Sequence, residues 1–267
     1  MEPLRTLVDD GSAAGTLPDA ISALYGGGLT MPAETCYANF VESLDGVVAL
    51  EVDGGGPATI ALHSEADRLV MGILRSLADC VVVGAGTVRD GWNHHWTPGH
   101  VYPDLQEAFT RLQVRAPQLV VVTASGNLDP AQPALHDSAL VLTTDAGARR
   151  LGNRLPASAQ LRSLGEARLT SRAIIEAVRA EGHRRLLTEG GPHLLGSLLR
   201  DRLLDELFLT LSPVLAGRMG GDSRLAMVHG VELLPERPVV ATLRSLKTEG
   251  SHLFLRYDLR DERQEQP

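Results

Sequence analysis

Aromatic residues are scarce, at 4% of the 267 positions, so we expect an aliphatic core. The two cysteines, Cys36 and Cys80, form neither a C-x-x-C pair nor a metal-ligand spacing, which excludes a disulfide scaffold and a cysteine metal site. No apolar run approaches the roughly 20 residues that cross a bilayer. No basic stretch followed by an apolar run marks a signal peptide at the N-terminus. We therefore expect a cytoplasmic protein without a membrane partner.

An excess of basic charge is also missing. Lysine and arginine number 25 against 33 acidic residues, and the formal net charge is −8. Nucleic-acid binding needs clustered basic side chains, so we expect no nucleic-acid partner. An anionic ligand must instead be held by a local arrangement. Hydrophobic residues make up 43% of the chain, which is an ordinary proportion for a globular protein with a sizeable core.

Short apolar runs alternate with amphipathic stretches over most of the chain. Continuous apolar runs such as 80–83 are typical of strands buried on both faces, and apolar residues at helical spacing follow Ser64, a good N-cap. The pattern predicts strands at 36–41, 47–52, 80–83, 118–123, 140–143, 185–188, 206–214 and 252–259, and helices at 17–25, 64–77, 105–114, 170–181 and 193–200. This order favours an α/β fold with a mostly parallel central sheet, flanking helices and antiparallel C-terminal strands.

The chain divides into three parts by composition. Residues 1–35 form an N-terminal extension, which either packs on the body or stays loosely ordered. Residues 36–260 form one domain without an internal linker, and the polar residues 261–267 form a tail.

The first chemically informative segment is the glycine-rich turn Gly84-Ala85-Gly86-Thr87 at the end of a buried strand. Glycines at this position allow a ligand to approach the backbone closely. Arg89 stands where a dinucleotide-binding fingerprint requires Gly or Ala, which argues against an ordinary Rossmann motif. By itself the segment favours a plain tight turn without a ligand.

The second is Glu189-Gly190-Gly191, which separates a strand from a helix that starts near Pro192. Proline is favoured in the first helical turn. The free N–H groups at this helix start, with the positive end of the helix dipole behind them, suit a pyrophosphate. They belong to Gly190, Gly191, His193 and Leu194. A structural turn without a ligand is the alternative.

Ligands of open α/β sheets bind outside the carboxyl ends of the strands, so two glycine turns there together favour a nucleotide cofactor. We expect no metal site, because the nine histidines include no H-E-x-x-H pattern and the side chains of His94 and His95 diverge. The segment 217–224 carries two arginines, and we interpret it as a surface loop.

Three segments resemble one known family. They are NFVESLDG (39–46), the stretch from Ser64 to Trp92 that ends in VVVGAGTVRDGW, and LLTEGGPHLLGSLLRDRLLDELFLTLSPVLAG (186–217). Together they look like the pyrimidine reductases of riboflavin biosynthesis, especially the stand-alone actinobacterial type. The resemblance implies a dihydrofolate reductase-like fold, a homodimer and NADPH as cofactor. It also implies a phosphorylated pyrimidine substrate, 5-amino-6-(5-phosphoribosylamino)uracil, which is reduced to the ribitylamino product.

The resemblance also assigns roles to individual residues. In the family, the threonine matched by Thr87 lies near the nicotinamide, and the turn matched by residues 189–194 carries the cofactor phosphates. Ser43 and Asp45 match the S-L-D-G loop beside the reacting groups, and Arg75 matches an arginine aimed at the substrate phosphate. Arginine suits that role because its guanidinium binds phosphate bidentately. Ser125 is a weaker candidate for the adenosine 2′-phosphate. Gly84, Gly86, Gly190 and Gly191 complete the predicted cofactor site.

Two departures from the family pattern affect the predicted catalytic and substrate groups. Position 91 is Gly where many members carry an aspartate, so we take Asp90, together with Glu189, as the candidate catalytic acids. Asn39 replaces a lysine of the bacterial members and is counted among the substrate-binding residues. The H-A-E and P-C-x-x-C motifs of the zinc deaminase that accompanies some members do not occur in this chain.

These departures leave other functions open. One is a reductase of dihydrofolate or of another pterin or pyrimidine. Another is a catalytically silent protein that binds NADPH. Turnover assays on both substrate classes distinguish the three hypotheses.

Overall fold

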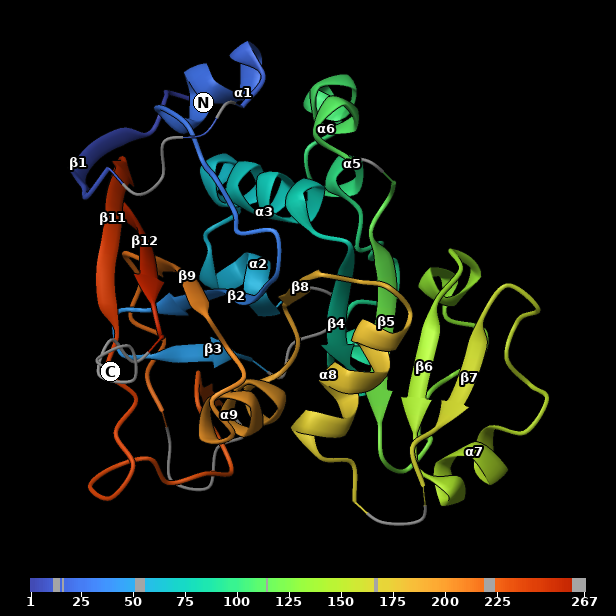
Figure 1. Ribbon diagram of the computed structural model, residues 1–267. Coiled ribbons are helices and arrows are strands. Elements are labelled where there is room, and N and C mark those ends of the chain that lie inside the picture. The colour runs from blue at the N-terminus through green and yellow to red at the C-terminus, as the bar shows by residue number, and fades with distance from the viewer. Residues whose placement is uncertain are drawn as a thin grey trace, which may run out of the picture.

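The computed structural model describes residues 1–11, 15, 17–50, 56–113, 115–165, 168–218 and 224–260. They form a ten-stranded sheet with the order β1-β11-β12-β9-β2-β8-β4-β5-β6-β7, and helices cover both of its faces (Figure 1). A two-stranded sheet of β3 (Val47–Ala49) and β10 (Leu225–Ala226) stands apart from it. The predicted tail and the middle of the predicted 217–224 loop lie outside the described residues.

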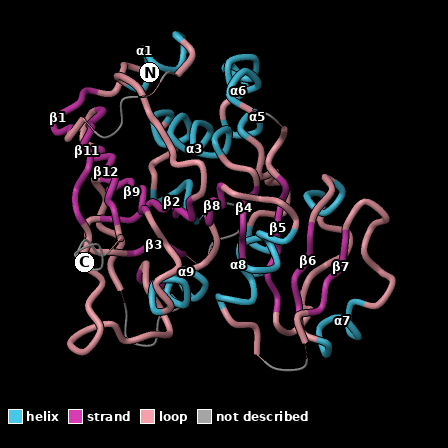
Figure 2. The backbone as a smooth tube through the Cα atoms, in the orientation of Figure 1, coloured by secondary structure: helices cyan, strands magenta, loops and turns pink. Residues whose placement is uncertain are grey.

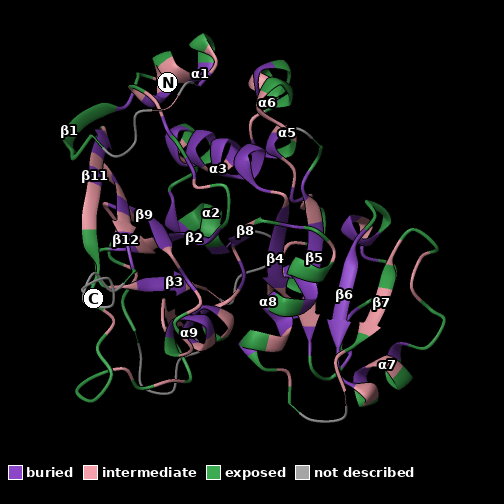
Figure 3. Cartoon of the chain, viewed as in Figure 1, coloured by how far each residue is buried: buried purple, intermediate pink, exposed green. Residues whose placement is uncertain are grey.

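The longer part of the sheet is parallel. Neighbouring strands in its centre bury hydrophobic side chains on both faces, and Figure 3 colours β2 and β4 as buried. Such strands read as continuous apolar runs, which is why the sequence predicts all of the parallel strands except the short edge strand β7. In sheet order they are β9 (Glu206–Ser212), β2 (Thr35–Ser43), β8 (Arg185–Thr188), β4 (Cys80–Gly84), β5 (Gln118–Thr123), β6 (Leu140–Thr143) and β7 (Gln160–Ser163).

An antiparallel flank completes the sheet on the β9 side. It consists of β12 (His252–Asp258), β11 (Thr242–Glu249) and β1 (Arg5–Asp9). The expected α/β class, with a mostly parallel sheet and antiparallel C-terminal strands, is confirmed. The N-terminal extension contributes β1 to the sheet edge, and it buries Ile21 and Tyr25 in the core from its helix.

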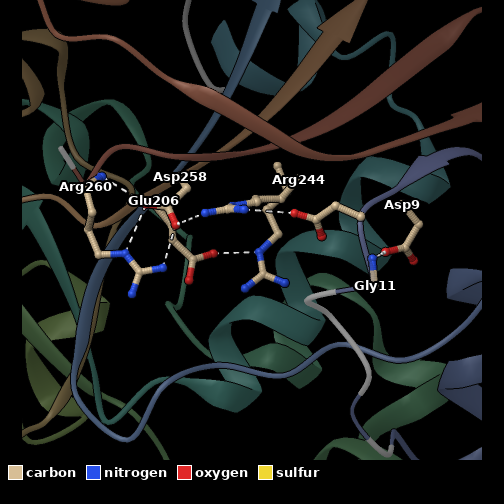
Figure 4. Close-up of polar contacts among 8 residues, drawn as sticks. Asp9, Gly11, Glu206, Arg244, Asp258 and Arg260 are labelled. Carbon is tan, nitrogen blue, oxygen red and sulfur yellow. Dashed lines mark hydrogen bonds and ion pairs between the residues drawn. The ribbon is translucent and has the colours of Figure 1, made fainter. Parts of the chain in front are cut away.

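Ion pairs hold the flank together (Figure 4). Asp258 accepts from Arg260 Nη2 at 2.5 Å and from Arg244 Nη2 at 2.9 Å. Burial alone would raise the pKa of Asp258, but the hydrogen bonds from the two arginines outweigh it and hold that pKa well below its ordinary value. At the border with the parallel part, Glu206 of β9 pairs with the buried Arg256 of β12 at 2.6 Å.

The helices form two layers (Figure 2). The core on one face contains side chains of α1, α3 and α6, and the core on the other contains those of α8 and α9. The helices are α1 (Asp19–Tyr25), α2 (Gly56–Ile60), α3 (Glu65–Leu77), α4 (Ala85–Asp90), α5 (Pro98–Val101), α6 (Gln106–Leu112), α7 (Asp145–Leu151), α8 (Ser171–Ala180) and α9 (Pro192–Arg200), with 3-10 turns at Pro103–Leu105 and Pro133–His136.

Helix α3 illustrates why the sequence predicts its elements well. Ser64 caps it by accepting a hydrogen bond from the N–H of Asp67 at 3.2 Å. Its apolar side buries Leu69 and Ile73 against the sheet. Among the described residues, every helix is too short or too polar to cross a bilayer.

Some predicted boundaries differ from the structure. The expected turn after β4 is the first turn of helix α4, which begins at Ala85. Strand β3 ends at Ala49, and positions 51–52 of the strand predicted there lie outside the described residues. Elements β1, β7, β10, β11, α2, α5 and α7 are absent from the sequence-based prediction.

Candidate functional site

The predicted site residues follow strands that end at one edge of the sheet. Ser43 ends β2 and Asp45 lies just after it, and Gly84 ends β4 with Thr87 just after it. Glu189–Gly191 follow β8, and Ser125 follows β5. All four strands are parallel and occupy neighbouring places in the sheet order. Their carboxyl ends therefore meet at the edge where open α/β sheets bind ligands.

The two glycine-rich turns are in direct contact. The N–H of Gly191 donates a hydrogen bond to Thr87 Oγ1 at 3.1 Å. A Cβ atom added to Gly190 would lie 2.4 Å from Val83 Cα and 2.6 Å from Gly84 N. Backbone thus packs on backbone where β8 and β4 end, and the sequence places glycine there because no side chain fits.

Space for a ligand lies beside this contact. A Cβ added to Gly84 would meet nothing within 4 Å, and one added to Gly86 would meet only Arg89 Nη2, at 3.7 Å. These two glycines are therefore not required by packing within the protein. A group that approaches the backbone closely can occupy this space, so the residues fit a nucleotide cofactor.

The start of helix α9 is more occupied than the sequence suggests. The N–H of Gly190 reaches Thr188 Oγ1 at 3.5 Å, that of Gly191 bonds Thr87, and that of Leu194 bonds the Gly191 carbonyl at 3.1 Å. Phosphate oxygens at this turn would have to share or replace these bonds. His193 is exposed on the first turn of α9, and its ring lies 4.6 Å from that of His229, edge to face.

A buried ion pair supports the second glycine turn. Arg75 Nε donates to Glu189 Oε1 at 2.9 Å, and Arg75 Nη2 donates to Glu189 Oε2 at 2.6 Å. The two side chains are only 1% and 8% exposed. Bidentate pairing fixes both the position and the orientation of the carboxylate. The backbone that leads into Gly190 is therefore held from helix α3.

The remaining donors of Arg75 go to the segment after α4. Nη1 donates to the carbonyls of His95 and Thr97 at 3.2 and 3.3 Å, and Nη2 lies 2.8 Å from His94 Nε2. Burial, and then the charge of Arg75, lowers the pKa of His94 to about 2, so this histidine is neutral and accepts. Each N–H of the guanidinium thus has a partner within the protein. The role of Arg75 as a ligand of substrate phosphate stays a prediction, and it would require one of these bonds to open.

The S-L-D-G corner is built around one exposed carboxylate. Ser43 Oγ donates to Asp45 Oδ1 at 2.6 Å and accepts from the N–H of Val47 at 2.9 Å. Asp45 also accepts from the N–H groups of Ala216 and Gly217, at 3.0 and 2.7 Å. The corner after β2 and the segment after β9 are thereby tied together.

These bonds give the first testable prediction. The hydrogen bond from Ser43, followed by the one from Ala216, lowers the pKa of Asp45 from 3.8 to about 2. Because the folded-state value is the lower one, the stabilisation is present above the ordinary pKa and is lost as the pH falls toward 2. We expect Asp45→Ala to speed amide hydrogen exchange at Ala216 and Gly217 at neutral pH at least tenfold.

Exchange measured by mass spectrometry or NMR checks this expectation. The exposed Asp104, which lies in a 3-10 turn, provides the control variant Asp104→Ala. Unchanged exchange in the Asp45 variant would show that the segment after β9 is held by other contacts.

Three predicted site residues lie apart from these contacts. Asn39 is 8% exposed and lines a small internal cavity together with Tyr25 and Arg256. The buried Nη1 of Arg256 has no hydrogen-bond partner among the described residues. Asp90 is exposed at the end of α4. Ser125 is exposed, and its Oγ accepts from the N–H of Asn127 at 3.3 Å. Their predicted roles stay predictions.

The groups that fix the site residues in place are not recognisable in the sequence. The segment His94–Thr97 and the N–H groups of residues 216–217 carry no motif, and their function follows from where the chain folds them. Within the described ranges, no three histidine, cysteine, aspartate or glutamate side chains gather in a way that would hold a metal ion.

Comparison with known proteins now adds a family and several relatives. The family model described as the RibD C-terminal domain matches residues 35–236. A protein from Archaeoglobus fulgidus named 2,5-diamino-6-ribosylamino-4(3H)-pyrimidinone 5′-phosphate reductase is 26% identical over 197 residues, which cover 70% of this chain and 83% of that protein.

Solved structures share the fold. A pyrimidine reductase-like protein from Corynebacterium diphtheriae superposes with a TM-score of 0.64 at 21% identity, covering 90% of this chain and 99% of that one. A deaminase and 5-amino-6-(5-phosphoribosylamino)uracil reductase from Thermotoga maritima superposes with a TM-score of 0.62 at 18% identity, covering 85% of this chain and 57% of that one.

Proposed function

This chain belongs to the family of the RibD C-terminal domain, and on that premise we propose that it is a nicotinamide-dependent reductase of a phosphorylated ribosylaminopyrimidine. The relative from Archaeoglobus fulgidus carries the name of such an enzyme. The contact between the two glycine-rich turns, from Gly191 N–H to Thr87 Oγ1, is the observation on which the cofactor site rests.

We propose NADPH as the cofactor. Gly84, Gly86 and Thr87 would hold it from the β4 side, and the turn before α9 would hold it from the β8 side. The open space at Gly84 and Gly86 and the positive end of the α9 dipole support this placement. When bound, the cofactor supplies a hydride, and the protein contributes binding, orientation and electrostatics.

The substrate proposal is narrower. The sequence resemblance implies 5-amino-6-(5-phosphoribosylamino)uracil, whereas the Archaeoglobus fulgidus relative is named for the diaminopyrimidinone form. The two compounds share the phosphoribosylamino group, where reduction takes place. They differ by an oxo or an amino group on the pyrimidine ring. We propose the uracil derivative as the substrate.

The test is NADPH oxidation, followed by absorbance, with both phosphorylated pyrimidines and with dihydrofolate. We expect rapid oxidation with the uracil derivative and much slower oxidation with dihydrofolate, with the same pyrimidine lacking its phosphate as the control. Faster reaction with the diamino form would identify that compound as the substrate. Faster reaction with dihydrofolate would show that the substrate is a pterin and not a phosphorylated pyrimidine. NADPH binding without turnover of any of them would indicate the catalytically silent alternative. The homodimer and the cytoplasmic location stay predictions.

A further inference from the structure

A buried carboxyl group on helix α3 has no role in the site described above. Asp67 is 6% exposed and lies in the first turn of the helix. Within the described part of the chain, its carboxylate takes part in no ion pair. Buried acids without a basic partner are uncommon, because burial penalises the charged form.

The position of Asp67 is set by strand β9. The side chain of Thr210 faces its carboxyl group closely enough to lower its pKa, and Thr210 is the register partner of Val41 on β2. Side chains on a strand alternate between faces, so Asn39, Val41 and Ser43 share one face with Tyr37. That face is the one covered by α3, because Tyr37 Oη donates to the Leu74 carbonyl at 2.8 Å. Asp67 therefore faces the same side of the sheet as two predicted substrate residues, Asn39 and Ser43, at the level of Val41 between them.

The charges around Asp67 leave it protonated more readily than an ordinary aspartate. Burial is the largest influence and raises its pKa, and the negative charge of Glu189 after β8 acts in the same direction. The Thr210 side chain, His252 on β12 and Arg68 on its own helix act in the opposite direction but do not cancel the rise. The fold thus holds a buried carboxyl group whose protonated form is favoured relative to an ordinary aspartate, on the face of the sheet that carries the predicted substrate residues.

A purely structural role explains this arrangement less well. Acidic residues in a first helical turn stabilise the helix as anions. Glu65 already performs that function in α3, with a side chain 54% exposed and paired with the N-terminal amine at 3.1 Å. A carboxyl group turned toward the sheet and favoured in its neutral form contributes little to the helix dipole.

We propose that Asp67 is the general acid of the reaction, donating its proton to the ring oxygen of the substrate ribose. This inference rests on the proposed function. In the step, the C1′–O4′ bond breaks and its electron pair leaves with O4′, which takes the proton from Asp67. The lone pair of the exocyclic nitrogen forms a C=N bond, which gives a ring-opened iminium ion. C1′ then accepts the hydride, the product is a neutral secondary amine, and solvent returns one proton to Asp67.

The decisive variant is Asp67→Asn, which keeps the shape and removes the proton. We expect kcat to fall by about 10²- to 10⁴-fold, the range typical of a lost general acid, while NADPH affinity stays unchanged. In the wild type, kcat should fall as the pH rises through the pKa of Asp67, because only the protonated form donates. That alkaline limb should disappear in the Asn variant and reappear in Asp67→Glu, with partly restored kcat.

Two controls separate catalysis from structure. Glu65→Gln removes a carboxylate from the same helical turn and should leave kcat and its pH profile unchanged. Infrared spectroscopy of the wild type without substrate should show the carbonyl band of a protonated carboxyl group that titrates with pH and is lost in Asp67→Asn. If the Asn variant does not fold, this band and the alkaline limb of the wild type still decide the question, and the absence of either overturns the proposal.

The outcomes distinguish this inference from the function on which it rests. An active wild type with an equally active Asp67→Asn variant overturns the role of Asp67 and leaves the reductase intact. A wild type that oxidises NADPH with none of the pyrimidines contradicts the proposed function itself.

Discussion

Replacing Gly190 by alanine is expected to destabilise the fold and to abolish cofactor binding. The new Cβ would lie 2.4 Å from Val83 Cα and 2.6 Å from Gly84 N, and both neighbours are backbone atoms of the buried strand β4. A flexible side chain could move away from such a contact, but a strand bonded to β5 and β8 cannot move alone. Overpacking usually costs about 1 to 3 kcal/mol, and we expect the free energy of unfolding to fall by the upper part of that range or more.

Urea unfolding and NADPH titration measure the two effects. Gly84→Ala is the matched control, because its Cβ meets nothing within 4 Å and should change stability by less than about 0.5 kcal/mol. We nevertheless expect it to weaken NADPH binding at least tenfold, because the methyl group fills the space proposed for the cofactor. Normal binding by Gly84→Ala would exclude a close approach to β4. Normal stability of Gly190→Ala would contradict the backbone contact.

Breaking the pair between Arg75 and Glu189 should have an effect of similar size. The side chains are 1% and 8% exposed, so Glu189→Gln leaves a buried guanidinium without a counter-charge, and Arg75→Met leaves a buried carboxylate. Losing one partner of a buried ion pair costs about 3 to 5 kcal/mol, whereas replacing both is often nearly neutral. We expect each single variant to lose stability in that range, and the double variant to recover most of the loss.

The same pair changes what is expected of substrate and cofactor binding. From the sequence alone, an Arg75 substitution should raise the Michaelis constant of a phosphorylated substrate and leave NADPH affinity nearly intact. In the structure Arg75 holds Glu189, which adjoins Gly190 and Gly191, so NADPH affinity should fall as well. Steady-state kinetics and NADPH titration of Arg75→Met check this. A raised Michaelis constant with full stability and normal NADPH affinity would instead identify Arg75 as a phosphate ligand.

The sequence predicts elements whose local pattern is strong. Strands β4 and β5 are continuous apolar runs, and α3 combines helical spacing with an N-cap at Ser64. The missed elements lack such patterns. Every residue of β1 is exposed, β11 carries the buried Ser245 and Lys247, and β7 is a short edge strand without a fully buried residue. These strands form because a neighbouring strand provides the backbone partners for their hydrogen bonds. The residues of the strand itself do not show which distant segment will pair with it.

The candidate site divides in the same way. The glycines at 84, 86, 190 and 191 are recognisable in the sequence. A side chain at Gly190 would collide with the backbone of β4, and the missing side chains at Gly84 and Gly86 leave space for a ligand. Arg75 is visible as a residue, but its partner Glu189 is 114 positions away, and its other partners carry no motif. Asp67 is visible only as a helix-initiating acid, and its burial near Thr210 follows from the packing of α3 on the sheet.

By itself the sequence determined the α/β class, the strands of the parallel sheet and the two glycine turns, because hydrophobic periodicity and the conformational freedom of glycine are local properties. Only the tertiary structure decided that the two turns touch, that Arg75 is bound by Glu189 and that Asp67 is buried beside Thr210. Each of these depends on which distant segments share a dry interior. In that interior an ionisable side chain either pairs with an opposite charge or favours its neutral form, and no short stretch of sequence shows which of the two occurs.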